Sequence, residues 1–111
     1  MFDRDGIPLW QQHLNGTAVN SNDSAFSAAL DNQGNVVAAG HMQTTGTSLD
    51  FTVAKFDRAG SLLWQQKLNG TANGDDQALS VGVDNHGNVV AAGATRNSGT
   101  FFDFTVAKFD R

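Results

Sequence analysis

The sequence predicts an all-β protein built from two similar units, and three observations support this fold class. Strong helix formers are scarce, because the 111 residues include 12 Gly but no Glu, and all 11 acidic residues are Asp. Short runs of β-branched and aromatic residues alternate with Gly and Asn, which is typical of strands separated by turns. The third observation is a repeat that spans nearly the whole chain.

The repeat has a period of 53 or 54 residues, set by the motif Phe-Asp-Arg at residues 2–4, 56–58 and 109–111. A second block, Asn-Val-Val-Ala-Ala-Gly, occurs at residues 35–40 and again at 88–93. About two thirds of the aligned positions are identical, which indicates a duplication. The fold of one unit should therefore also be the fold of the other.

Each unit predicts four short strands, which in the second unit are residues 61–68, 77–84, 88–95 and 103–110. Two of the connections between strands are tight turns, in which an Asp caps its own turn and a Gly takes the positive φ. We therefore expect hairpins there. Apolar residues occupy both faces of the strands, as Val89 and Val90 illustrate, so we expect sheets covered on both sides. Antiparallel four-stranded sheets stacked face to face form the blades of a β-propeller.

Three motifs recur in the same order in both units. They are Asp-Asn-x-Gly-Asn-Val-Val-Ala-Ala-Gly, then Asp-Phe-Thr-Val-Ala-Lys-Phe-Asp, then Gly followed by Leu-Trp. Over nearly the whole chain this pattern resembles the SBBP-type β-propeller repeat of bacteria. The resemblance implies a propeller fold and a protein of the bacterial exterior or cell surface. The family is named for seven blades, whereas this chain holds two units.

The units divide the chain into three parts. Residues 25–68 form a first blade with all four strands, residues 69–111 form a second blade without its own outer strand, and residues 1–24 hold a spare outer strand and a loop. Two open blade faces and an open strand edge favour aggregation, so a lone monomer is not expected.

The sequence predicts that the chain closes into a ring with copies of itself. A heterologous contact of this kind closes by rotation, and two blades per chain give six blades for a trimer or eight for a tetramer. We expect the trimer in preference to the tetramer. The alternative is an excised or engineered piece of a longer propeller. The strand that should complete a neighbour's second blade contains Ile7, Leu9, Trp10 and Leu14.

The long polar loops are the predicted place for a ligand, because binding residues concentrate on loops. A carbohydrate-binding, lectin-like propeller is therefore the alternative function, and a protein ligand is a further possibility. Trp10 and Trp64 suit a sugar platform less well than packing between blades, because each lies within an apolar and polar alternation. The candidate residues are Arg96, Asn97, Phe101, Asp75 and Asp76 from one unit, with Gln43, Thr44 and Asn22 from the other.

Other functions lack support in the sequence. None of the three His recurs between the units, and no nucleophilic triad is evident, so we expect no enzyme and no catalytic residue. The Asp-rich turns lack the ligand pattern of a calcium loop, and no cofactor or metal is expected. A net charge of −4 with scattered basic residues argues against nucleic acid, and no apolar run or basic leader predicts a membrane span or export signal. The expected function is a non-enzymatic, self-assembling structural or interaction scaffold.

Overall fold

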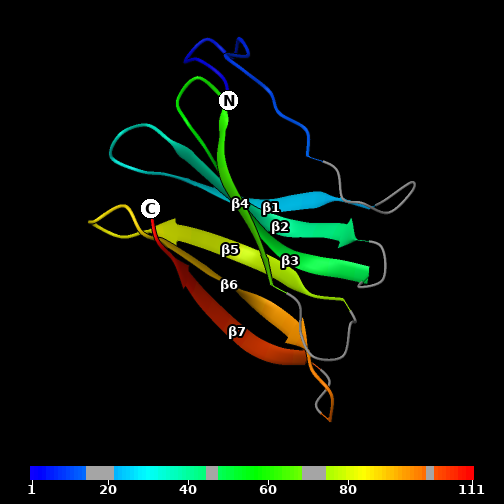
Figure 1. The fold of residues 1–111 in the computed structure, drawn as a ribbon. Helices are drawn as coiled ribbons and strands as arrows, with labels where there is room; N and C mark the ends of the chain where they lie inside the picture. Colours follow the sequence, from blue (N-terminus) through cyan, green and yellow to red (C-terminus); the bar gives the residue numbers. More distant parts are fainter. Residues whose placement is uncertain (15–21, 45–47, 69–74, 100–101) are drawn as a thin grey trace.

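Two antiparallel β-sheets make up the part of the chain that the structure describes, which is residues 1–14, 22–44, 48–68, 75–99 and 102–111 (Figure 1). The structure is a computed structural model. No helix occurs in these ranges, and the prediction of an all-β fold is confirmed. Sheet 1 has the strand order β1(Ser24–Leu30), β2(Val36–Thr44), β3(Ser48–Phe56) and β4(Leu62–Leu68). Sheet 2 has the strand order β5(Gln77–Val83), β6(Val89–Arg96) and β7(Phe102–Phe109).

The tight turns form because an Asp side chain replaces missing backbone partners. Oδ1 of Asp31 accepts hydrogen bonds from the backbone N–H groups of Gln33 and Asn35, both at 2.9 Å, and Gly34 takes a φ of 84°. The predicted hairpins are therefore confirmed. The same bonds recur at the turns that begin with Asp57 and Asp84, and also at Asp3 in the N-terminal segment.

The first strand of each sheet is bulged and runs very close to the second strand. Register shifts occur between Ala25 and Ser27 in β1 and at the equivalent place in β5. A Cβ atom at Gly40 would overlap the carbonyl oxygen of Ser24, and one at Gly93 would overlap that of Gln77. Glycine is required at both positions because a side chain has no room there.

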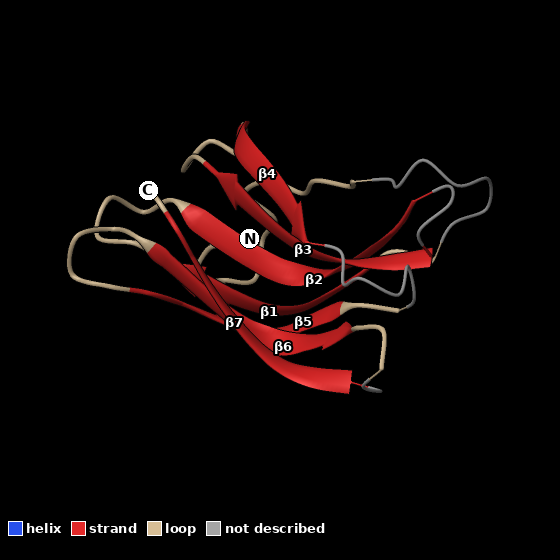
Figure 2. Ribbon diagram, turned by 60° about the horizontal axis from the view of Figure 1, so that its bottom comes forward, coloured by secondary structure: helices blue, strands red, loops and turns tan. Residues whose placement is uncertain are grey.

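The two sheets pack face to face, as Figures 1 and 2 show, with β1, β2 and β3 all in contact with β5. Paired residues of neighbouring strands share one face of a sheet, so the register divides each sheet into two faces. We call the interface between the two sheets the joint, and the face of each sheet that lies in it the joint face. The joint face of sheet 1 carries Val37, Ala39, Phe51 and Val53. It packs against the joint face of sheet 2, which carries Ala78, Val81, Val89 and Ala91.

Each sheet also has a face that the other sheet does not cover. The outer face of sheet 2 carries Val90, Ala92, Phe104 and Val106, which are the repeat equivalents of the joint face of sheet 1. The open face of sheet 1 carries Ala25, Ala28, Val36 and Ala38, which are the equivalents of the joint face of sheet 2.

Candidate functional site

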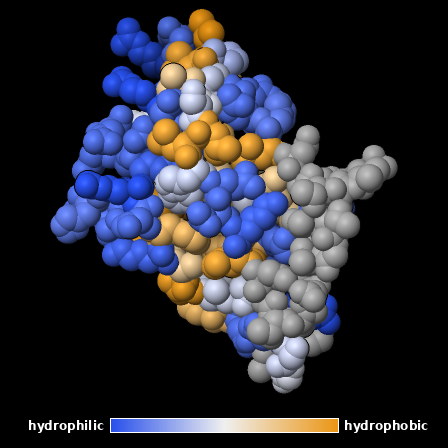
Figure 3. All heavy atoms as spheres, viewed as in Figure 1, coloured by the Kyte–Doolittle hydropathy of each residue, from blue (hydrophilic) through white to orange (hydrophobic). Residues whose placement is uncertain are grey.

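The outer face of sheet 2 exposes large apolar side chains. Phe104 is 88% exposed, Val106 is 56% exposed, and Phe102 lies beside them at 52%. In the space-filling view, several groups of apolar residues reach the surface with polar residues between them (Figure 3). Within the described residues β7 pairs only with β6, so its second edge is open. An apolar face next to an open strand edge is typical of a protein interaction site.

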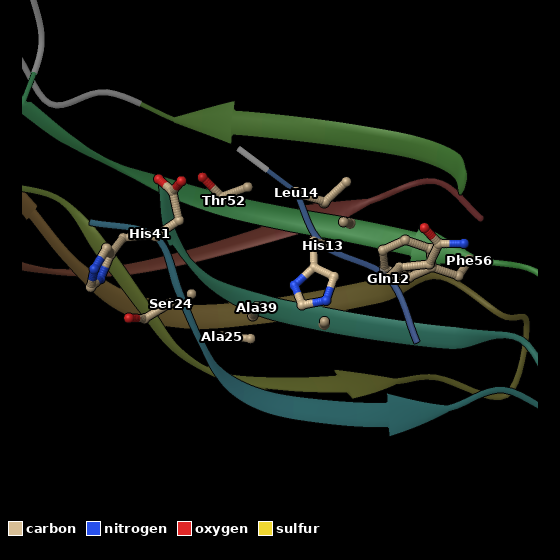
Figure 4. A pocket seen from close by; sticks show the side chains of 13 residues that line it. Gln12, His13, Leu14, Ser24, Ala25, Ala39, His41, Thr52 and Phe56 are labelled. Carbon is tan, nitrogen blue, oxygen red and sulfur yellow. The ribbon is translucent and has the colours of Figure 1, made fainter. Parts of the chain in front are cut away.

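The open face of sheet 1 borders a hollow of about 400 Å³. Gln12, His13 and Leu14 lie across the strands on one side of this hollow, and small side chains such as Ala25 form its floor (Figure 4). The hollow has room because Ala38 and Gly40 bring little or no side chain to its floor.

The N-terminal segment, residues 1–14, packs on sheet 1 as β4 packs on sheet 2. The rings of Trp10 and Phe56 lie 5.7 Å apart with 40° between their planes. Their repeat equivalents, Trp64 of β4 and Phe109 of β7, lie 5.9 Å apart with 35° between their planes. Nε1 of Trp10 also donates a hydrogen bond to the carbonyl oxygen of Arg58 at 3.1 Å.

Residues 1–10 form a small hairpin of their own. Phe2 and Pro8 form an isolated antiparallel bridge, and the N–H of Leu9 donates to the carbonyl of Met1 at 2.8 Å. Phe2 is the repeat equivalent of Phe56, which pairs with Leu62 in the same way. Residues 2–10 therefore have the local structure of a β3–β4 turn and the start of an outer strand.

Hydrogen bonds between described residues cross the joint between the sheets. Oγ of Ser27 in β1 accepts from the backbone N–H of Val81 in β5 at 3.3 Å. The backbone N–H of Asp76 donates to the carbonyl of Leu49 at 2.6 Å. Both bonds hold the first strand of sheet 2 to the joint side of sheet 1.

An ion pair occurs at the same position in both sheets, and its exposure differs. Nζ of Lys55 lies 3.2 Å from Oδ2 of Asp31, and the two side chains are 6% and 4% exposed. Nζ of Lys108 lies 3.0 Å from Oδ2 of Asp84, where the side chains are 59% and 27% exposed. The first pair is shielded because the turn at 85–87 of sheet 2 lies next to it.

Both carboxyl groups of these ion pairs have lowered pKa values. Burial by itself raises the pKa of Asp31, but hydrogen bonds from Asn35, Lys55 and Gln33 outweigh it and lower the pKa to about 2. The hydrogen bond from Lys108 is the largest cause that holds the pKa of Asp84 well below its usual range.

The loop residues predicted to bind a ligand fall into two groups. In sheet 2, Oδ1 of the fully buried Asp76 accepts from the backbone N–H of Arg96 at 2.7 Å. In sheet 1, Oε1 of Gln43 accepts from the backbone N–H of Asn22 at 3.0 Å. Asp23, the repeat equivalent of Asp76, accepts a hydrogen bond from the backbone N–H of Gln43 at 2.8 Å. The carboxylate at this repeat position therefore makes the same kind of bond in each sheet.

The other predicted ligand residues lie in or beside the same loops. Nδ2 of Asn97 donates to Oδ2 of Asp103 at 2.6 Å, and Asp75 is half-buried beside β5. Thr44 ends β2. Phe101 lies outside the described residues. The ligand assignment as a whole stays a prediction.

The described residues contain no cluster of three or more His, Cys, Asp or Glu side chains that could hold a metal ion. His13 contacts a neighbour in the N-terminal segment, where its Nε2 lies 2.8 Å from Nε2 of Gln11. Within the ranges that the structure covers, no helix is long and apolar enough to cross a membrane.

Together the fold and these surfaces define an all-β protein of two stacked sheets, each with one face that the other sheet does not cover. No family model matches the sequence, and no curated protein matches it as a relative. The SBBP resemblance therefore stays a prediction. Sequence reasoning predicted apolar residues on both faces of the strands and two open blade faces, and the identity of Phe51 and Phe104 across the repeat is the signal that matches the outer face of sheet 2 to the joint face of sheet 1.

Proposed function

We propose that this chain is a non-enzymatic scaffold that assembles with copies of itself into a β-propeller. In this assembly each sheet is one blade. Residues 8–14 of one copy pair with the open edge of β7 in the next copy and become the fourth strand of its sheet 2. The contact is heterologous, because one end of a copy meets the other end of its neighbour.

The observation that carries this proposal is the repeated packing of tryptophan on phenylalanine. Trp10 lies on Phe56 as Trp64 lies on Phe109, with ring distances of 5.7 and 5.9 Å. Residues 8–14 thus already occupy, relative to sheet 1, the place that the outer strand of a preceding blade would take. That preceding blade is sheet 2 of another copy.

The register of the new strand pair follows from β3 and β4. Val53 pairs with Gln66 and Lys55 with Trp64 in sheet 1. The repeat equivalents are Val106 with Gln12 and Lys108 with Trp10. Pro8 falls at the first position of the added strand, where a missing N–H group is tolerated.

The absolute mass in solution tests this proposal. The chain has a mass of 11.8 kDa, so a ring of three copies has a mass of about 35 kDa and a ring of four about 47 kDa. These rings contain six and eight blades, within the range known for propellers. Light scattering at several concentrations should find one of these two masses, with the trimer as the expected form.

Two proline variants separate the exchanged strand from the sheet that already exists. Gln11→Pro combined with Gln12→Pro removes two N–H groups from the strand that would join β7, and neither residue belongs to a sheet of the single chain. This variant should stay folded and lose the oligomer. Gln65→Pro, the control in β4, should lower the stability of sheet 1 itself. An unchanged oligomer in the Gln11→Pro, Gln12→Pro variant would contradict strand exchange.

Binding of carbohydrate by the long loops stays the alternative function. A glycan array on the assembled protein tests it, with Arg96→Ala as the control variant because the side chain of Arg96 is not needed for the backbone bond to Asp76. Binding to one class of glycan that Arg96→Ala abolishes would support this alternative. An array without signal would remove it.

A further inference from the structure

We infer that the hollow on the open face of sheet 1 is the docking site for Phe104 and Val106 of a second copy. This inference rests on the proposed function, because it describes how the same two copies meet face to face. It adds a second surface to the strand pairing at β7, and it assigns the hollow to a protein partner rather than to a small ligand.

The first argument is the identity of the surfaces. The outer face of sheet 2 carries Val, Ala, Phe and Val at the four positions where the joint face of sheet 1 carries Val, Ala, Phe and Val. The open face of sheet 1 matches the joint face of sheet 2 at three of four positions, and the difference is Ala28 in place of Val81. The two free faces therefore have the chemistry of two faces that already pack together in this chain.

The second argument is where the hollow lies. Its floor includes Ala25 and Ala38, the equivalents of Ala78 and Ala91. In sheet 2 those two alanines are fully buried in one cluster with Phe51 and Val53. The hollow is thus the equivalent of a place that Phe51 and Val53 already cover on sheet 2. A second copy would bring Phe104 and Val106 to it.

The third argument is that polar groups of the joint have equivalents on the free faces. Ser27 Oγ accepts from the N–H of Val81 across the joint. The equivalent pair is Ser80 on one copy and the N–H of Ala28 on the next, and both residues are exposed in the single chain. Docking in the same geometry therefore brings Ser80 to Ala28.

A cysteine pair tests this geometry. The chain has no Cys, so Ala28→Cys combined with Ser80→Cys places the only two thiols in each copy. The two residues lie on opposite outward faces of the stacked sheets, so a short bismaleimide should join them only between copies. The control is Ser27→Cys combined with Val81→Cys, because the side chain of Ser27 already reaches the backbone N–H of Val81 across the joint.

The expected result is a covalent ladder from the Ala28→Cys, Ser80→Cys variant that stops at the number of copies in the ring. The Ser27→Cys, Val81→Cys control should react within one chain and keep a mass of 11.8 kDa under denaturing conditions. Adding Phe104→Asp to the first variant should raise the concentration needed for half-assembly by about ten-fold or more, because it places a charge in an apolar contact.

The outcomes distinguish the two proposals. An oligomer that forms without linker but gives no covalent ladder, while the control reacts, would overturn the docking geometry and leave the scaffold proposal standing. If both the Ala28→Cys, Ser80→Cys variant and the unmodified chain are monomeric, the docking geometry and the scaffold proposal are both overturned. A ladder that Phe104→Asp does not weaken would overturn the assignment of Phe104 to the hollow.

Discussion

The same two apolar residues, a phenylalanine and a valine of the repeat, have opposite environments in the two sheets. Phe51 and Val53 of sheet 1 are fully buried, whereas their equivalents Phe104 and Val106 of sheet 2 are mostly exposed. The local sequence is the same, Asp-Phe-Thr-Val-Ala-Lys-Phe, and so is the strand conformation. The difference lies only in the neighbour, because sheet 2 covers sheet 1 and no described residue covers the outer face of sheet 2. Burial in a repeat protein is thus a property of adjacent units rather than of one unit.

The two equivalent ion pairs also differ in exposure because of the neighbouring sheet. Lys55 and Asp31 are shielded by the next sheet, whereas Lys108 and Asp84 are exposed to water. The distance between Nζ and Oδ2 is nearly the same in the two pairs. A buried pair depends on both partners, because a charge left alone in a shielded site is strongly unfavourable. An exposed pair contributes little. In an assembled ring the two pairs should become alike.

The largest predicted difference between the sheets is in the two phenylalanines. Phe51→Ala should lower the free energy of unfolding by about 3–5 kcal/mol, because it leaves a cavity in the core. Phe104→Ala should change the stability of the dilute single chain by no more than about 0.5 kcal/mol, since it removes an exposed side chain. Urea denaturation at low protein concentration measures both. Equal losses would contradict the exposure of Phe104.

The next prediction concerns acid. The pKa of Asp31 is lowered from 3.8 to about 2 in the folded chain, so the unfolded state binds more protons between these values. The contribution of Asp31 to stability is fully present above about pH 4 and is lost as the pH falls toward 2. Asp31→Asn should remove this dependence and cost about 3 kcal/mol near neutral pH, because it leaves Lys55 shielded without its carboxylate.

Thermal unfolding between pH 2 and pH 6 checks this prediction, with Asp84→Asn as the matched variant. The exposed pair of sheet 2 should give the smaller loss at neutral pH. An Asp31→Asn chain that remains as sensitive to acid as the original would show that other carboxyl groups dominate acid unfolding.

Amine labelling should report the covering of sheet 2 directly. In the dilute single chain Lys108 should be acetylated several times faster than Lys55, because its side chain is far more exposed. In the assembled protein the turn at 32–34 of the next copy should cover Lys108, as the turn at 85–87 covers Lys55. Mass spectrometry of peptides measures both rates, and persistent fast labelling of Lys108 in the oligomer would contradict the docking geometry.

The smallest predicted effect concerns Phe2. Phe2 pairs with Pro8 in the single chain, at the place that Phe109 of a second copy would take in the assembly. Phe2→Ala should therefore strengthen assembly by a few-fold, because it weakens the pairing of Phe2 with Pro8 that competes with the second copy. The effect is small because Phe2 is itself largely exposed. Sedimentation velocity over a concentration series measures the change. Weaker assembly in this variant would indicate that Phe2 contributes to the contact between copies.

The local structure could be predicted from the sequence because its determinants are local. The turns follow from an Asp, a Gly and their spacing, and β7(Phe102–Phe109) differs from the predicted 103–110 by one residue at each end. The joint is harder to predict, because the residues of its two faces recur almost unchanged on the faces that no second sheet covers, with Ala28 in place of Val81. The position of Trp10 over Gly60 likewise depends on a contact 50 residues away, for which the repeat gave the only signal.

The loop carboxylates show a further limit of the sequence. Asp76 stands among polar residues in a long loop, which made a ligand role reasonable. Its carboxylate caps the backbone of Arg96 and is fully buried. This role depends on where the loop returns to β6, and a single polar position in a sequence does not carry that information.

Hydrogen exchange along β7 tests the central claim most directly. In sheet 1 β3 is paired on both sides, whereas β7 is paired on one side within the described residues. We expect the amide groups of β7 that point away from β6 to exchange rapidly in dilute protein and to gain the protection of β3 as the oligomer forms. Protection of β7 that appears with the mass of three or four copies would establish the exchanged strand. An oligomer of that mass in which those amides still exchange freely would contradict it.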